Sequence, residues 1–257
     1  MTSPVDTPEI IEKLPAPANF VHLRVHSEFS MIDGIVRIKD MIKTTAGYHM
    51  PAVGLTDQSN MYALVKFYKA AQGAGIKPVI GVDIWLENEE ERDAPFRLTL
   101  FAQDKVGYRH ITEIISQAYS HNQFDDKAIV RKEWLFEKSA GLIVLSGFRD
   151  GDIGQQIIKG NVDIAEGLLA DYQQHFGNRF YLELQRTGRE NEELVLDASL
   201  VLAQKLNVPV VATNDVRFIQ QDDFEAHETR VCIGESYALA DKRRIKRYSD
   251  QQYFRSP

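Results

Sequence analysis

The chain has 257 residues, of which 44% are hydrophobic and 26% charged, and its formal net charge is −7 at pH 7. These values are typical of a globular protein, and the acidic balance argues against a broad basic face for nucleic acid on this chain alone. The single cysteine, Cys232, excludes a disulfide framework and a cysteine-based zinc cluster. The sequence contains no apolar run that could span a membrane and no secretory leader pattern, so we expect a cytoplasmic protein.

Strand and helix patterns alternate along most of the chain. The predicted strands are residues 20–26, 52–57, 76–86, 96–102, 141–146, 180–184 and 208–213. The predicted helices are residues 35–46, 60–74, 104–119, 152–158, 162–175, 190–206 and 222–231, with a packed element at 134–136 and an exposed loop at 121–129. This order predicts an α/β fold in which a mainly parallel sheet closes into a barrel.

The two ends of the chain differ from this pattern. Four prolines fall within residues 1–19, which we expect to form a flexible leader before a barrel domain at residues 20–240. Residues 241–257 are expected to form a linker and the start of a further domain, because a basic run at 242–247 precedes a capping-box pattern at Ser249 and Gln252. A helix is therefore predicted where the sequence stops, and we expect a fragment of a longer protein.

The first predicted strand carries three large polar side chains. His22, Arg24 and His26 fall on one face of the strand because side chains alternate with period two. Three such groups on one face are not typical of an apolar core. We expect them to line a cavity, bind a ligand or pair with acids from other strands.

Further polar side chains follow the later predicted strands, where the carboxyl ends of parallel strands would share one face. They are Asp57, Asp83, Ser146, Glu183, Arg186, Asp215 and Arg217, and Asp33 lies in the turn after the first predicted strand. A single aspartate at a strand end most often caps the next helix. Several carboxylates together with His26 favour a shared site, and the residue types suggest a divalent metal that hydrolyses a phosphoester.

Two arginines conflict with that metal site. Arg24 and Arg217 would point into the acidic cluster, and a guanidinium has no lone pair to give to a metal. Each can instead pair with carboxylates and supply the positive charge of a missing cation. We therefore expect both arginines to contact the cluster of Asp33, Asp57, Asp83 and Asp215.

Several segments together resemble the PHP (polymerase and histidinol phosphatase) family, and most closely its members in bacterial replicative DNA polymerases. The segments are residues 20–34, 55–60, 75–81, 181–184, 212–218 and 222–228. The resemblance implies a distorted seven-stranded, TIM-like (β/α) barrel.

The resemblance also implies which residues would face the cleft of the metal-binding members. They are His22, Arg24, His26, Asp33, Asp57, Gln58, Asp83, Glu183, Thr187, Asp215 and Arg217. Positions that carry a histidine in the metal-binding members hold Arg24, Gln58, Thr187 and Arg217 here, and Phe148 stands where a cysteine or histidine ligand is expected. The shorter Asp83 replaces a glutamate. The resemblance therefore implies a vestigial cleft with no metal and no catalytic residue.

Two functions remain as alternatives. The first is a noncatalytic structural and docking domain of a DNA polymerase, without a cofactor of its own, whose parent chain uses Mg²⁺ at a polymerase site elsewhere. The implied partners are the rest of the polymerase chain, a proofreading exonuclease subunit and, through other domains, DNA; no membrane is involved and the fragment is a monomer. The alternative is an active phosphoesterase, either a pyrophosphatase or a 3′–5′ exonuclease, with Zn or Mn on His26, Asp33, Asp57, Asp83 and Asp215.

Overall fold

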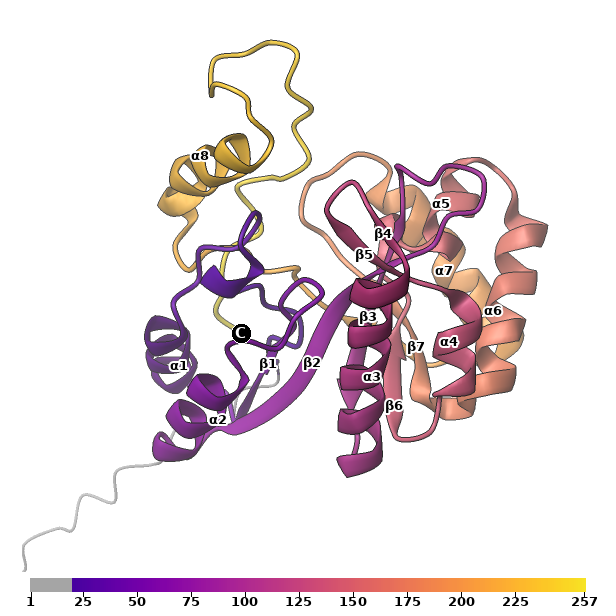
Figure 1. The fold of residues 1–257 in the computed structure, drawn as a ribbon, viewed down its shortest axis with the longest axis horizontal. Coiled ribbons are helices and arrows are strands. Elements are labelled where there is room, and N and C mark those ends of the chain that lie inside the picture. The colour runs from indigo at the N-terminus through magenta and orange to yellow at the C-terminus, as the bar shows by residue number, and fades with distance from the viewer. Residues whose placement is uncertain (1–19) are drawn as a thin grey trace, which may run out of the picture.

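The computed structural model describes residues 20–257, which form a mixed α/β fold (Figure 1). The predicted leader at residues 1–19 lies outside the described residues. The strands are β1 (Ala52–Leu55), β2 (Lys77–Leu86), β3 (Phe96–Ala102), β4 (Gln123–Phe124), β5 (Lys127–Val130), β6 (Leu142–Leu145), β7 (Phe180–Leu184) and β8 (Val210–Ala212). The α-helices are α1 (Ile38–Gly47), α2 (Leu64–Gly73), α3 (Lys105–His121), α4 (Lys132–Glu137), α5 (Asp152–Ile158), α6 (Val162–Phe176), α7 (Glu192–Leu206) and α8 (Phe224–Gly234).

The strands form one mixed sheet in the order β4-β5-β2-β3-β6-β7-β8, with β1 beside β2. The pairs β1–β2, β6–β7 and β7–β8 are parallel, but β3 is antiparallel to both β2 and β6. The expectation of a mainly parallel sheet is therefore corrected at β3. Residues 87–95 connect β2 to β3 without a helix, and a parallel crossover needs about a dozen residues or more.

The predicted strand at residues 20–26 forms only isolated bridges. Its extended backbone nevertheless makes hydrogen bonds in two directions, to Gly54 and Thr56 on the β1 side and to Val216 just after β8, at 2.7 to 3.1 Å. Residues 22–27 therefore lie between β1 and the segment that follows β8, and they link these two parts in a barrel-like arrangement. The segment is extended as predicted but is not a regular strand, because one side of it meets a short strand and the other meets irregular backbone.

Gly54 allows the close approach of this segment to β1. A Cβ atom added at Gly54 would lie 1.9 Å from the carbonyl oxygen of Leu23. Any other residue at this position would push the extended segment away from β1. The side chains of Arg24 and His26 depend on that contact for their position.

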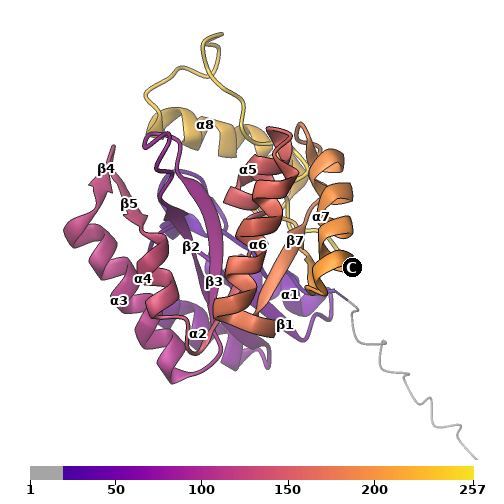
Figure 2. The same ribbon diagram turned by 90° about the vertical axis from the view of Figure 1, so that its right-hand side faces the viewer.

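Two apolar cores stabilise the fold. The larger lies among β2, β3, β6 and β7 and helices α3 and α5–α7, and the smaller joins α1, α2 and β1 to Val25, Val216 and Phe254. Figure 1 shows β2 passing from the half that holds α1, α2 and β1 to the half that holds β3, β6 and β7. Figure 2 shows helix α3 on one side of β2 and β3, and helices α5–α7 on the other side, beside β7. Helix α4 packs against α6, where the ring of Phe136 stacks on that of His175.

The structure differs from the sequence prediction in two further segments. The β4–β5 hairpin forms within the predicted exposed loop at 121–129. Residues 250–256 do not form the predicted helix: Phe254 bonds through its backbone to Phe218 at 3.0 Å and is buried. Among residues 20–257, no helix is long and apolar enough to cross a membrane.

A buried charge cluster as the candidate functional site

Six ionisable side chains meet inside the barrel-like arrangement, between the two apolar cores. We name this group the charge cluster: Arg24, His26, Asp33, Asp83, Asp215 and Arg217, each no more than 4% exposed. Alternation along the backbone explains their position. Val25 and Val216 point into the smaller core, while Val82 and Ile84, on either side of Asp83, point into the larger one.

Arg24 contacts three carboxylates. Its Nε donates a hydrogen bond to Asp83 Oδ2 at 2.9 Å and lies 3.3 Å from Asp215 Oδ1. Its Nη1 lies 3.4 Å from both carboxylate oxygens of Glu183 on β7. One guanidinium therefore joins β2, β7 and the segment after β8.

Arg217 neutralises the other side of the cluster. Its Nη1 donates to Asp33 Oδ2 at 2.7 Å and also contacts His26 Nδ1, while its Nη2 donates to Asp215 Oδ1 at 2.6 Å. Asp215 has a φ angle of 46°, in the left-handed region that aspartate tolerates better than most residues. This turn places its carboxylate between Arg217 and Arg24.

His26 lies between two carboxylates. Its Nε2 is 2.8 Å from Asp83 Oδ2 and its Nδ1 is 2.9 Å from Asp33 Oδ1. Burial and the neighbouring Arg217 oppose protonation, but Asp33 and Asp83 outweigh them and raise the pKa of His26 above its ordinary value.

The arginines also fix the charge of the acids. Burial alone would raise the carboxyl pKa values, yet Arg217 and His26 hold the pKa of Asp33 well below its usual range, and Arg217 and Arg24 do the same for the pKa of Asp215. Glu183 shows the opposite balance, because burial raises its pKa in spite of Arg24. Opposite charges at close range thus keep the three aspartates of the cluster ionised.

Asp57 is separate from the charge cluster, although the sequence grouped it there. Its carboxylate accepts hydrogen bonds from Ser27 N at 2.6 Å, Ser27 Oγ at 2.8 Å and Ser30 Oγ at 2.7 Å. Neither Arg24 nor Arg217 bonds to it. The predicted arginine contacts are present for Asp33, Asp83 and Asp215, and the prediction was wrong for Asp57.

Three other predicted cleft residues bond to backbone groups or to side chains outside the charge cluster. His22 Nε2 bonds to the carbonyl oxygen of Arg255 at 2.9 Å, and its ring packs 4.1 Å from that of Phe254. Gln58 donates to the carbonyl oxygen of Asp83 at 3.2 Å. The backbone N–H of Thr187 donates to Glu192 at 2.7 Å. None of the three bonds to a side chain of the charge cluster.

Four residues that the sequence did not predict extend the site, and they come from β3, the loop after β7 and the chain end. They are Arg97, Arg189, Tyr248 and Gln252.

Each of these residues reaches an acid of the cluster. Arg97 and the Tyr248 hydroxyl each donate to Asp33 Oδ2 at 3.1 Å. Gln252 donates to Asp215 Oδ2 at 2.7 Å, and Arg189 lies 3.9 Å from the same oxygen. Because they follow the predicted barrel limit at residue 240, Tyr248 and Gln252 could not be identified from strand ends.

The atoms that could ligate a metal are already bonded to cations. Ligand atoms of His26, Asp83 and Asp215 lie within 4.8 Å of one another. However, Arg24 lies against Asp83 Oδ2, and Arg217 and Arg24 lie against Asp215 Oδ1. Guanidinium groups cannot ligate a metal. This donor set does not suit a cation while both arginines keep these positions.

Known proteins similar to this chain point to one family. The profile of the PHP domain matches residues 22–187. The chain is 54% identical over 239 residues to the DNA polymerase III subunit alpha of Pseudomonas aeruginosa and 46% identical over 237 residues to that of Escherichia coli (strain K12). These matches cover 93% and 92% of this chain but only 20% of each relative, so the chain spans about a fifth of their length.

A solved structure supports the fold alone. An amidohydrolase from Chromobacterium violaceum superposes with a TM-score of 0.51 at 13% identity, covering 82% of this chain and 96% of the other. The profile match covers most of the chain and includes Arg24, His26, Asp33 and Asp83 of the charge cluster, whereas Asp215 and Arg217 follow its end. The chain therefore belongs to the PHP domain family.

Proposed function

We propose that this chain is the PHP domain of a bacterial DNA polymerase III alpha subunit and that it acts as a noncatalytic structural and docking domain. The identity of about half to the alpha subunits of two bacteria supports the first part. The charge cluster supports the second, because its cations are side chains that cannot leave the site.

The position of the two guanidiniums is the main support for a noncatalytic role. Arg24 and Arg217 both contact Asp215, and each contacts a second carboxylate of the cluster. A hydrolytic PHP site would need a metal to lower the pKa of water or to polarise the phosphoester. Here the carboxylates that would hold it are neutralised by arginine, which supports a structural role.

The first experiment is metal analysis of the purified chain. We expect no stoichiometric Zn, Mn or Fe, because the guanidiniums compete for the same carboxylate oxygens. One or more tightly held metals per chain would contradict the proposal. Dialysis against a chelator is the matched treatment, and we expect it to leave the unfolding temperature unchanged.

An active metal-dependent phosphoesterase is the second candidate, and one observation favours it. The ligand atoms of His26, Asp83 and Asp215 are close enough to hold one ion if both arginines moved away. This candidate requires Zn or Mn and expects hydrolysis of pyrophosphate, a phosphomonoester or a DNA 3′ end. Activity that survives repurification and is lost in both Asp83→Asn and Asp215→Asn would establish it.

The docking role concerns partners outside the chain. We propose that the domain contacts the rest of the alpha polypeptide and the proofreading exonuclease (epsilon) subunit, in the cytoplasm, while DNA and the Mg²⁺ of polymerisation belong to other domains. The chain by itself is expected to be a monomer. Co-purification of the cognate exonuclease subunit with this 257-residue chain tests the proposal. Failure to bind at micromolar concentrations of both proteins would remove the docking part.

A further inference from the structure

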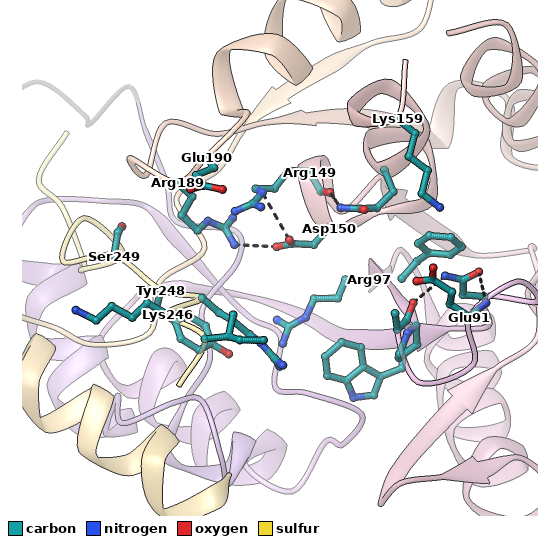
Figure 3. A pocket seen from close by; sticks show the side chains of 18 of the residues that line it. Glu91, Arg97, Arg149, Asp150, Lys159, Arg189, Glu190, Lys246, Tyr248 and Ser249 are labelled. Atoms are coloured by element: carbon teal, nitrogen blue, oxygen red, sulfur yellow. Dashed lines mark hydrogen bonds and ion pairs between the residues drawn. The ribbon is translucent and has the colours of Figure 1, made fainter. Parts of the chain in front are cut away.

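A second feature lies beside the charge cluster: an open pocket of about 530 Å³ (Figure 3). Its walls come from residues 85–97 at the β2–β3 turn, residues 149–159 before and within α5, residues 188–190 after β7, and residues 245–249 near the chain end. Arg97 and Tyr248 belong to this wall and also bond to Asp33 of the charge cluster. The pocket therefore begins where the buried cluster ends.

The pocket is cationic although the chain as a whole is acidic. Its lining contains the cations Arg97, Arg149, Lys159, Arg189, Lys246 and Arg247 and the carboxylates Glu91, Asp150 and Glu190. The lining thus has six positive and three negative groups, whereas the chain has a net charge of −7. Cations concentrated in a concave surface raise the local concentration of anions.

Two arginines on one wall, Arg149 and Arg189, differ in how well carboxylates pair with them. Arg189 Nη1 donates to Asp150 at 2.8 Å, and Arg149 Nε lies 3.8 Å from the same carboxylate. Figure 3 shows both guanidiniums beside Asp150, while Arg97 is directed towards Tyr248. The Nε atom of Arg149 is buried and has no hydrogen-bond partner among residues 20–257. Arg189 also lies 3.5 Å from Glu192 and 3.9 Å from Asp215, so it is well paired, whereas Arg149 shares Asp150 and keeps donors for an anion.

We propose that this pocket binds an oligophosphate chain, either inorganic or as part of a nucleotide. Guanidinium groups match phosphate oxygens with paired hydrogen bonds, and the pocket volume lies in the range of small-molecule sites. Cations on separate walls, with Arg149 on one and Lys246 on another, suit a ligand with several linked phosphates rather than a single one. The bound chain would lie outside the charge cluster and would not need to be hydrolysed.

The test is isothermal titration of the 257-residue chain with inorganic tripolyphosphate at low ionic strength. We expect saturable binding at one site that weakens as salt is added. Arg149→Gln should weaken binding about tenfold or more, because a charge-assisted hydrogen bond is lost. Lys159→Gln should weaken it less, since this lysine lies at the rim and is 40% exposed.

Lys66→Gln is the matched control. Lys66 and Lys159 are both partly exposed and each faces one glutamate, at 3.3 Å and 3.7 Å, but Lys66 lies outside the pocket. Equal weakening in Lys66→Gln and Arg149→Gln would mean nonspecific attraction and would overturn the site. Absence of saturable binding would also overturn it.

Two further ligands separate the possible sources. Equal affinity for tripolyphosphate and a nucleoside triphosphate supports recognition of the phosphate chain alone, and tighter nucleotide binding that keeps its loss in Arg149→Gln supports a nucleotide. Binding of an acidic peptide or an oligonucleotide, with none of either triphosphate, would overturn the proposal. Release of phosphate during the titration would count against the noncatalytic function but not against the pocket.

Discussion

Two buried carboxylates that the sequence placed in one cluster have opposite environments. Asp215 bonds to Arg217, Gln252 and, at longer range, Arg24, and its pKa lies well below the ordinary value. Asp57 bonds to Ser27 and Ser30 without a cation, and burial raises its pKa in spite of those hydrogen bonds. Both carboxylates are buried, and the guanidiniums beside Asp215 account for the opposite directions of the two pKa shifts.

The charge cluster and the turn around Asp57 have different structural tasks. The charge cluster joins the extended segment to β2 and β7 through ion pairs, and to the chain end through hydrogen bonds from Tyr248 and Gln252. The second region, the serine turn of Ser27, Ser30 and Asp57, fixes one local loop against the end of β1. Loss of a charge partner should affect the whole fold, whereas loss of a turn contact should affect one loop.

The largest effect is expected for Arg24→Ala. Breaking a buried ion pair from one side leaves uncompensated charges and typically costs about 3–5 kcal/mol of unfolding free energy. Chemical denaturation at pH 7 measures this value. The control is Arg186→Ala, which removes an exposed pair with Glu193 and should change the unfolding free energy far less, because solvent screens that pair.

Acid should reduce the difference between Arg24→Ala and the parent. In the parent the pKa values of Asp83 and Asp215 are lowered, so their stabilisation is present above the ordinary aspartate pKa and is lost as pH falls through the lowered values. In the variant the same acids protonate at higher pH and relieve their repulsion. A difference that stays constant between pH 7 and pH 3 would contradict this ion-pair account.

A smaller effect is expected when the two carboxylates themselves are made neutral. Asp215→Asn leaves Arg217 with a weaker partner and should cost about 2–4 kcal/mol. Asp57→Asn keeps an acceptor for Ser27 N and should cost about 1 kcal/mol. The two variants are isosteric and both sites are buried, so each is the control of the other in the same denaturation series. Equal losses would show that the difference in cations has no energetic consequence.

The sequence predicted most helices and strands, because apolar periodicity records which face of each element is buried. It also identified the aspartates and arginines of the charge cluster. It missed Arg97 because parallel strands were expected, and in that arrangement only carboxyl ends reach the site. Since β3 is antiparallel to β2, Arg97 near its start pairs with Trp85 near the end of β2. The helix-free connection at 87–95 was the signal for this reversal.

Contacts between segments that are distant in sequence could not be predicted, and two residues of the site depend on such contacts. Tyr248 and Gln252 reach the cluster only because the chain end returns to the barrel, where the Arg217 N–H donates to the Gln252 carbonyl oxygen at 2.8 Å. A local sequence pattern records no such return. The Ser249 and Gln252 pattern does form one hydrogen bond of a capping box, at 3.0 Å, but no helix follows it. The same local bond therefore serves a turn.

A bound metal ion should be able to replace the positive charge of Arg24 and Arg217 once both side chains are changed. Changing Arg24, Arg217 and Gln58 together to histidine removes the two guanidiniums and adds possible ligands beside Asp83 and Asp215. Added Zn²⁺ should then raise the unfolding free energy by about 2.7 kcal/mol at a hundredfold excess over its dissociation constant. The parent protein is the control and should show no change with Zn²⁺. An equal response of both proteins would place the metal elsewhere.

The smallest effect concerns His22, which lies in the same extended segment as His26 but outside the charge cluster. Burial lowers the pKa of His22 to about 4, despite its hydrogen bond to Arg255. For this base the folded pKa is below the unfolded value, so stability is complete above about pH 6.5 and falls as pH drops towards 4. The pKa of His26 is raised, so its contribution to stability depends on pH in the opposite direction: it is present below about pH 6.5 and is lost as pH rises.

His22→Gln isolates the first of these contributions, because a glutamine amide can still donate to the Arg255 carbonyl oxygen. Between pH 7 and pH 5.5 the parent should lose about 1 kcal/mol through His22, and the variant should not. His227, whose pKa burial also lowers to about 4, leaves a similar loss in both proteins. His121→Gln, at an exposed helix end, is the control and should behave as the parent. If His22→Gln kept the full acid dependence of the parent, the pKa of His22 in the folded protein would not lie below its unfolded value. The contrast between the two histidines, one beside acids and one beside Phe254, would then be wrong.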